Sequence, residues 1–252
     1  MIDKVDKRRA WRAARDLGAR LATGRGPVMT YGVIALCCAV FVVSPASGLN
    51  PAYGTGEQLL AAQRDYFARW GVIPAELLSG SARAAVTPVT ALFVHASWLH
   101  LLGNMLFLYV FGVMTEERLG HLRFALFYVG CGALALCVYA LANAGSTQSL
   151  VGASGAISAV LGGFLRLFPK ARVTSLFPFL FFLPLRFPAW LVLPFWVALQ
   201  WLAARRDSEG PTVAYLAHLA GFALGFGCAW VLQARRTRVS TPATATEGDS
   251  KP

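Results

Sequence analysis

A serine and a histidine that could act as nucleophile and general base both occur inside strongly apolar stretches of the sequence. Ser154 lies in the run Val151-Gly-Ala-Ser-Gly-Ala-Ile157, and His218 lies in the apolar run 214–222. A hydroxyl or an imidazole buried in hydrocarbon without a partner is costly, so polar groups at such depth usually bond to one another or serve a function. The two side chains therefore suggest nucleophilic catalysis within a membrane, on condition that the fold brings them together.

Other residues of the sequence could complete such a site. His100 and Asn104 are four residues apart, so on a helix they project from one face and offer hydrogen-bond donors to one point. Ser154 stands at the start of an apolar segment, where a helix N-terminus would stabilise a developing negative charge. Gly152 and Gly155 leave room for another backbone or a substrate carbonyl to approach. Together these residues predict an oxyanion site around the serine.

The composition is that of an integral membrane protein. Of the 252 residues, 56% are hydrophobic and 14% are charged, and the mean hydropathy is +0.55. A spanning helix needs about 20 mostly apolar residues. Six segments approach that length, namely 28–46, 98–116, 122–143, 153–168, 188–204 and 213–233. The sequence predicts an all-α, polytopic membrane domain of six helices over 28–233, with a long external loop at 47–97 that is ordered and partly embedded.

The distribution of charge predicts the topology. Basic residues of this chain, whose net charge is +11, gather in the N-terminal tail, in the loops after the second and fourth segments, and in the C-terminal tail, with Arg205 and Arg206 as the exception. By the positive-inside rule both termini are cytoplasmic, and the charge indicates membrane topology rather than nucleic-acid binding. The second, fourth and sixth segments then begin at the external face, so the early polar residues of all three share one layer.

The two tails are expected to lie outside the membrane domain. Residues 1–27 form a basic cytoplasmic tail, which is either a surface helix on anionic headgroups or a solvated segment. Residues 234–252 are expected to be a disordered cytoplasmic tail because they show no apolar periodicity.

Small residues favour close packing between the segments that carry Ser154 and His218. A four-residue spacing sets Ala217, Gly221 and Gly225 in one ridge, which could pack against Ser158, Ala159, Gly162 and Gly163. The simpler interpretation is that the Gly-x-Ser-Gly run only packs helices, because small residues are the usual contact between membrane helices. A histidine tilts the balance toward chemistry, since an amide would serve structure equally well.

Several other types of site are disfavoured by the sequence. Ala156 stands where the nucleophile elbow of soluble hydrolases has its second glycine, and no strand precedes Ser154. Acidic residues are absent from the expected depth, so a dyad is more economical than a triad, with the His218 tautomer set by packing or a backbone carbonyl. The cysteines fall in apolar segments without a C-x-x-C pair, which predicts neither disulfides nor zinc. His95 is expected to bond a loop carbonyl, His121 to be incidental, and the run 116–118 to be a structural charge cluster.

Three motifs jointly resemble those of the rhomboid intramembrane serine proteases. They are His95-x-x-x-x-His100-x-x-x-Asn104, Gly152-Ala-Ser154-Gly155 and Ala217-His218-Leu-Ala-Gly221, and the run Glu116-Glu-Arg118-Leu-Gly120 is similar as well. The resemblance covers about residues 28–233 and implies the bacterial six-helix form in the inner membrane. It implies Ser154 as nucleophile, His218 as base, and His100, Asn104 and the Ser154 N–H as the oxyanion site, with Gly152, Gly155, Gly221 and His95 in support. Neither a metal nor a cofactor is implied.

The same resemblance carries expectations about substrates. Transmembrane proteins would be cut near the external face, after lateral access beside the fifth segment, where Trp190, Trp196 and Trp201 suggest a loosely packed, lipid-facing helix. Fixed kinks are the alternative explanation of Pro188 and Pro194. The partners implied are transmembrane substrates and membrane lipids, not nucleic acid.

One position departs from the family pattern, and two rival functions remain open. Some rhomboids stack an aromatic side chain on the catalytic histidine one turn after the serine, where this chain has Ser158. A catalytically silent protein that binds membrane proteins is one rival. A metalloenzyme or transporter using His95, His100 and His218 is the other, although an i, i+5 spacing sets the first two rings roughly 140° apart on a helix, which suits one metal poorly.

Overall fold

The computed structural model describes the backbone of residues 26–177, 183–206 and 215–239, and every predicted apolar segment contains a helix. These helices are α2 (Val28–Val43), α6 (Trp98–Phe107), a π-helical turn (Leu108–Gly112), α7 (Val113–Leu119), α8 (His121–Ala142), α9 (Ser154–Leu167), α10 (Ala189–Arg206) and α11 (Tyr215–Val239). The fold is therefore an all-α membrane bundle, as predicted.

Length distinguishes two groups among these helices. Trp98–Leu119, His121–Ala142 and Tyr215–Gln233 are long and apolar enough to cross a bilayer, whereas α2, α9 and α10 are apolar but shorter. The protein is an integral, multi-pass membrane protein. Six membrane crossings remain a prediction.

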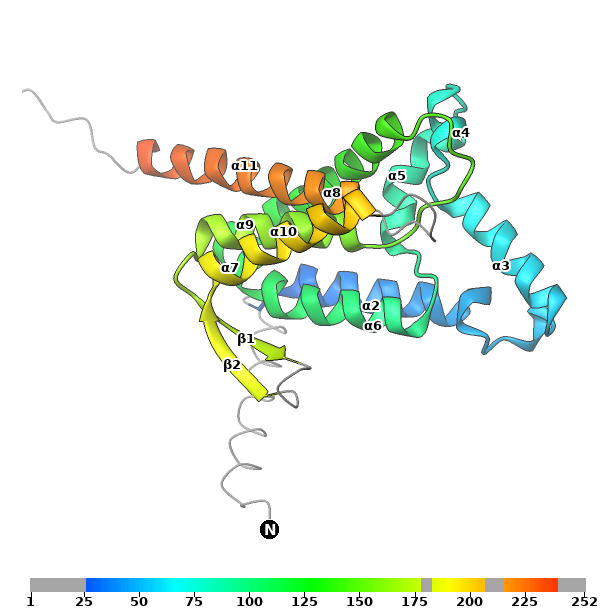
Figure 1. Ribbon diagram of the computed structural model, residues 1–252, viewed down its shortest axis with the longest axis horizontal. Coiled ribbons are helices and arrows are strands. Elements are labelled where there is room, and N and C mark those ends of the chain that lie inside the picture. Colours follow the sequence, from blue (N-terminus) through cyan, green and yellow to red (C-terminus); the bar gives the residue numbers. More distant parts are fainter. Residues whose placement is uncertain (1–25, 178–182, 207–214, 240–252) are drawn as a thin grey trace, which may run out of the picture.

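Helix α9 occupies the centre of the bundle. It contacts α6, α7, α8, α10 and α11, and its residues from Gly155 to Phe164 are all buried. In Figure 1 α9, α10 and α11 run side by side, with α2 and α6 beneath them. Because neighbouring helices surround α9, its short span is covered by protein rather than exposed to lipid.

The connection 47–97 is ordered, as expected. It folds into η1 (Pro45–Ser47), η2 (Pro51–Tyr53), α3 (Glu57–Trp70), α4 (Pro74–Leu78), η3 (Ala84–Val86), α5 (Thr87–Thr90) and η4 (Ala91–Phe93). Val72 and Leu150 pair as an isolated antiparallel bridge with two N–H···O bonds of 2.8 Å, and the Gly152 N–H donates to the Ala91 carbonyl at 2.9 Å. The connection thereby fixes the backbone immediately before Ser154.

A β-hairpin separates α9 from α10, where the sequence indicated only a loop. Strand β1 (Arg172–Phe177) pairs antiparallel with β2 (Leu183–Pro188), so that Arg172 lies opposite Pro188. Figure 1 shows the hairpin projecting from the bundle away from α3. Pro188 ends β2 and Pro194 lies inside α10.

The membrane-domain boundary at 233 stays a prediction, and the apolar span of the last helix ends at Gln233. Helix α11 continues to Val239, beyond the end expected for the membrane domain. The rest of the expected C-terminal tail, 240–252, and the N-terminal tail up to residue 25 lie outside the described residues.

A fully buried carboxylate joins α7 to the start of α2. Glu116 on α7 accepts hydrogen bonds from the backbone N–H of Met29 at 2.9 Å and of Thr30 at 2.7 Å, and from the Thr30 hydroxyl at 2.7 Å. These N–H groups belong to the first turn of α2, which has no side-chain cap of its own. Nδ1 of His121 lies 2.5 Å from Oε1 of the same carboxylate. The prediction that His121 is incidental was therefore wrong.

Replacing Glu116 by alanine is expected to destabilise the protein by roughly 3 kcal/mol or more, because two buried N–H groups and a hydroxyl would lose a charged acceptor. Thermal unfolding in detergent measures the effect. Glu57→Ala, which removes an exposed carboxylate from α3, is the control and should change the midpoint little. Equal losses for both variants would contradict the cap.

Candidate active site

The structure brings Ser154 and His218 into hydrogen-bond contact. Ser154 is the first residue of α9, and its Oγ lies 2.8 Å from Nε2 of His218 on the first turn of α11. Both side chains are partly buried. A serine hydroxyl that donates to an imidazole nitrogen at this distance has the geometry of a nucleophile beside its base.

The close approach of α9 and α11 depends on small residues, as the sequence predicted. A Cβ built on Gly221 would overlap the carbonyl oxygen of Gly155, and one built on Gly225 would overlap the carbonyl oxygen of Ala159. The two backbones therefore touch directly beside the serine and the histidine.

His100 lies next to the serine in a defined tautomer. Ser97 caps α6 by accepting the His100 N–H at 3.2 Å, which fixes the start of the helix. The Ala96 N–H points at Nδ1 of the His100 ring at 3.5 Å, which favours the tautomer protonated at Nε2. A Cβ on Gly152, whose φ is +130°, would lie 2.7 Å from that Nε2 and 3.8 Å from Ser154 Oγ. Only glycine fits between them.

Asn104, one turn further along α6, has an amide that is free to donate. Its Nδ2 is buried and has no hydrogen-bond partner among the residues that the structure describes. Buried polar groups are rarely left unpaired, so such a donor marks a place where a ligand atom can bind. His100 and the N-terminus of α9 thus supply donors near the serine, and Asn104 supplies a further buried donor one helical turn from His100.

Two residues of α10 that the sequence reasoning missed contact His218. Oε1 of Gln200 lies 2.7 Å from Nδ1 of His218, and the Trp196 ring lies 6.2 Å from the imidazole with a tilt of 32°. The expectation that packing or a backbone carbonyl sets the tautomer was incomplete, because a side-chain amide occupies that position. Trp190 and Trp201 are exposed as predicted, whereas Trp196 faces the interior. Ser158 stands where some rhomboids have an aromatic side chain, and its hydroxyl donates to the Ser154 carbonyl at 2.7 Å.

Residues 83–235 match the family model of the Rhomboid domain, which covers more than half of the chain. The chain belongs to the rhomboid family. Rhomboids form a family of intramembrane serine proteases, so the contact between a serine and a histidine lies where the family resemblance implies it.

Curated relatives agree with this assignment. The chain is 32% identical over 151 residues to Rhomboid protein 1, mitochondrial, of Saccharomyces cerevisiae, which covers 58% of this chain and 42% of that protein. It is 28% identical over 152 residues to RHOMBOID-like protein 6, mitochondrial, of Arabidopsis thaliana, covering 57% and 42%. Rhomboid-like protein 11, chloroplastic, of Arabidopsis thaliana is 45% identical over 69 residues, covering 27% and 24%. The rhomboid described here thus spans less than half the length of these relatives.

His95 of this rhomboid lies between η4 and α6, only 1% exposed, with its ring 5.2 Å from that of His100. Burial lowers the pKa of His95 to about 4, with the His100 ring adding to the effect and the backbone of Phe93 opposing it. Neither ring nitrogen makes a hydrogen bond of regular geometry within the described part of the chain, although the sequence predicted a bond to a loop carbonyl. The ring therefore stays neutral at physiological pH.

Acidification is expected to destabilise this rhomboid through His95. Its folded pKa of about 4 is below the ordinary value of 6.5, so the stabilisation is complete above pH 6.5 and is lost as the pH falls toward 4. The full loss is on the order of 3 kcal/mol. Thermal unfolding of the unmodified protein and of His95→Gln across this range should show a shallower decline in the variant. Parallel declines would contradict the assignment.

Proposed function

We propose that this rhomboid is an intramembrane serine endopeptidase that cleaves transmembrane segments of other proteins near the external face. The hydrogen bond of 2.8 Å between Ser154 Oγ and His218 Nε2, at the ends of two apolar helices, is the observation that carries the proposal. A serine and a histidine this close, in a membrane domain without an evident structural need for both, support acyl transfer better than packing.

The acylation step follows from the positions of the two side chains. Ser154 Oγ attacks the carbonyl carbon of the scissile peptide while His218 Nε2 accepts the hydroxyl proton. The tetrahedral intermediate collapses as the C–N bond breaks, and His218 returns the proton to the leaving amine. Water that enters from outside then loses a proton to His218 and attacks the acyl carbon. The bond between that carbon and Ser154 Oγ breaks, the carboxylic acid product leaves, and His218 returns the proton to Oγ.

The oxyanion of each intermediate is stabilised by His100, Asn104 and the backbone N–H of Ser154. His100 donates through Nε2–H, and Asn104 donates through the amide that has no partner in the described structure. The Ser154 N–H at the positive end of α9 adds to this stabilisation. Because the donors are in place before the reaction, little reorganisation accompanies charge development.

Charge and resemblance support the finer localisation. The chain lies in a bacterial inner membrane with both termini cytoplasmic, as the excess of basic residues in alternate loops favours. The membrane domain spans 28–233, with a basic cytoplasmic tail before it and a second cytoplasmic tail after it. Substrate helices approach beside α10, whose Trp190, Phe195 and Trp201 are exposed.

Cleavage in a reconstituted system tests the function. The protein is placed in liposomes with a labelled transmembrane substrate and compared with Ser154→Ala, with the exposed-loop control Ser79→Ala, and with unmodified protein in a chelator. We expect the unmodified protein, the control and the chelated sample to cleave, and Ser154→Ala to be inactive. Cleavage by Ser154→Ala would overturn the mechanism, and substrate binding without cleavage by the unmodified protein would favour a silent scaffold.

A further inference from the structure

We propose that Gln200 on α10 is the positioning residue of the His218 base. Serine, histidine and glutamine then form one hydrogen-bonded chain, in which the glutamine orients the ring. This inference rests on the proposed function. Gln200 and His218 lie on different helices, and their contact of 2.7 Å joins Oε1 of the amide to Nδ1 of the ring. The opposite ring nitrogen is the one that faces Ser154, at 2.8 Å.

The chemistry of the ring explains why this contact matters. A neutral imidazole carries one proton, and Nε2 can accept the serine proton only when Nδ1 bears it. An amide oxygen at Nδ1 accepts that N–H and therefore selects the useful tautomer. When Nε2 takes up the serine proton, the Nδ1–H remains bonded, so the imidazolium is stabilised without rearrangement.

An amide suits this depth in the membrane better than a carboxylate. Gln200 is the one amide in a helix whose other residues from 189 to 204 are apolar or aromatic. A carboxylate there would have to be desolvated together with its charge, whereas a neutral amide costs far less to bury. The other polar or titratable groups that face His218 are His100 on α6, Tyr215 on α11 and Ser154 on α9.

The same face of α10 also fixes the plane of the ring. Trp196 and Gln200 are four residues apart, one turn of helix, and both contact His218. The Trp196 ring lies 6.2 Å from the imidazole with a tilt of 32°, whereas the Ser158 hydroxyl is bonded to the Ser154 carbonyl. One helix thus supplies both the hydrogen bond and the aromatic contact that hold the base.

Substitutions of Gln200 test this role. Gln200→Leu keeps the size but loses the acceptor, and is expected to lower kcat by about 10²- to 10³-fold with KM nearly unchanged. Gln200→Glu retains an acceptor oxygen at the same reach but has to bury a carboxyl group, so it should recover part of the loss. Gln233→Leu removes a second amide from a membrane helix, α11, remote from the site, and serves as the matched control.

Three measurements decide the outcome. Thermal unfolding checks that Gln200→Leu folds as well as the control, and cleavage in liposomes gives kcat and KM. A kcat for Gln200→Leu equal to that of the unmodified protein overturns the positioning role while leaving the proposed function intact. A kcat for a folded Gln200→Glu that is no higher than that of Gln200→Leu also overturns it. Absence of cleavage by the unmodified protein would instead overturn the proposed function.

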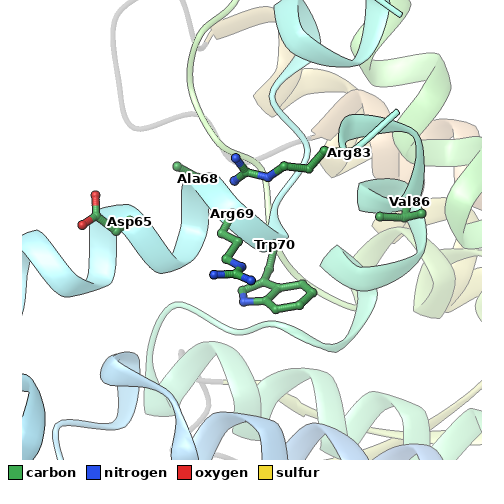
Figure 2. A pocket seen from close by; sticks show the side chains of 6 residues that line it. All are labelled: Asp65, Ala68, Arg69, Trp70, Arg83 and Val86. Atoms are coloured by element: carbon green, nitrogen blue, oxygen red, sulfur yellow. The ribbon is translucent and has the colours of Figure 1, made fainter. Parts of the chain in front are cut away.

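A different surface points to a lipid site at the end of the bundle where α2 meets the connection 47–97. A cleft of about 570 Å³ lies between α3 and the segment before η3, lined by Arg69, Trp70, Arg83 and Asp65 among others. Figure 2 shows Arg69 folded over the Trp70 indole, at 5.3 Å from guanidinium to ring, and Arg83 extending toward α3 from the opposite wall. The two guanidiniums outnumber the single carboxylate.

An apolar groove adjoins this cleft through Trp70. The groove has a volume of about 350 Å³ and is lined by Leu36, Val40 and Val43 of α2, by Phe93 and by the same tryptophan. Leu36 and Val43 are exposed, so the groove opens along the surface of α2. A basic cleft and an apolar groove that share Trp70 match the two parts of an amphiphile.

We infer that this surface binds an anionic phospholipid, with its phosphate between Arg69 and Arg83 and an acyl chain along α2. Guanidinium groups recognise phosphate oxygens, and tryptophan is favoured at the level of the headgroups. The net charge of the three ionic side chains complements that of a phosphodiester.

Lipid-dependent unfolding tests the site in the purified full-length protein. Phosphatidylglycerol should raise the midpoint by several degrees more than phosphatidylcholine with the same chains, and sodium phosphate should not reproduce the effect. Arg69→Gln with Arg83→Gln should lose at least half of the difference, whereas Arg64→Gln on the same helix should keep it. Equal responses to both lipids, an equal response to phosphate, or a full response of the double variant would each overturn the site.

Discussion

Replacing His218 by alanine is expected to lower the rate of cleavage by roughly 10⁴- to 10⁶-fold, as loss of the base does in other serine hydrolases. The reason is the contact of 2.8 Å between its Nε2 and Ser154 Oγ, which is the route by which the hydroxyl loses its proton. In an apolar site, bulk water cannot replace a positioned base. The rate constant is measured in liposomes with a labelled transmembrane substrate.

Non-additivity is the sharper part of this prediction. Ser154 and His218 act as one unit. The rates of Ser154→Ala, His218→Ala and the double variant should therefore agree within about tenfold. His121→Ala is the control for loss of an imidazole. His121 is the first residue of α8 and contacts Glu116, so this variant should cleave at close to the unmodified rate per folded molecule. Rate losses that multiply in the double variant would contradict a serine–histidine unit.

Gly221→Ala is expected to cause the second large effect, a loss of about 3 kcal/mol in stability together with a fall in kcat of about 100-fold. A methyl group on Gly221 would overlap the Gly155 carbonyl oxygen, which is backbone and cannot move aside alone. Helices α9 and α11 must therefore separate, and the two residues that carry the chemistry sit at the adjoining helix ends. Thermal unfolding and cleavage are measured on the same samples.

Gly227→Ala is the matched control for this substitution. It lies on α11 as well, and nothing comes within 4 Å of a Cβ built on it. Alanine is a better helix former than glycine by up to about 1 kcal/mol, so the control should be as stable as the unmodified protein or slightly more stable. Equal destabilisation by both variants would contradict direct backbone contact at Gly221.

The sequence predicted the helices and the contact between Ser154 and His218 because the signals are local. Apolar length marks the helices, and the alternation of basic loops places the starts of three segments in one layer. Small residues at four-residue spacing then predict which faces approach, and the structure places Gly221 against Gly155 as that spacing indicates. The π-helical turn Leu108–Gly112 does not change the depth of His100 and Asn104, because it follows both residues in the chain.

Contacts between helices separated by loops were harder to predict. Gln200 is 18 residues from His218 and lies on a different helix, so no local spacing links them. The third member of a catalytic triad is usually an acid, and an uncharged amide in the middle of an apolar helix does not stand out in the sequence. The different orientation of Trp196 could have been predicted from helix geometry. Trp190 and Trp201 lie roughly 20° apart around a helix, and Trp196 lies roughly 120° from Trp190.

Other differences have similar physical causes. Glu116 looked like part of a charge cluster, but the N–H groups it binds are 86 and 87 residues earlier in the chain. The hairpin at 172–188 has no strict alternation of apolar and polar residues and contains prolines, which weakens the sequence signal for strands.

Covalent labelling of Ser154 by a fluorophosphonate tests the central claim most directly. The probe reacts with a serine only when a neighbouring base takes its proton, so it reports the unit itself rather than any substrate. We predict one label per chain, mapped by mass spectrometry to Ser154 and lost in His218→Ala. A label on another residue, or undiminished labelling of Ser154 in His218→Ala, would contradict the account.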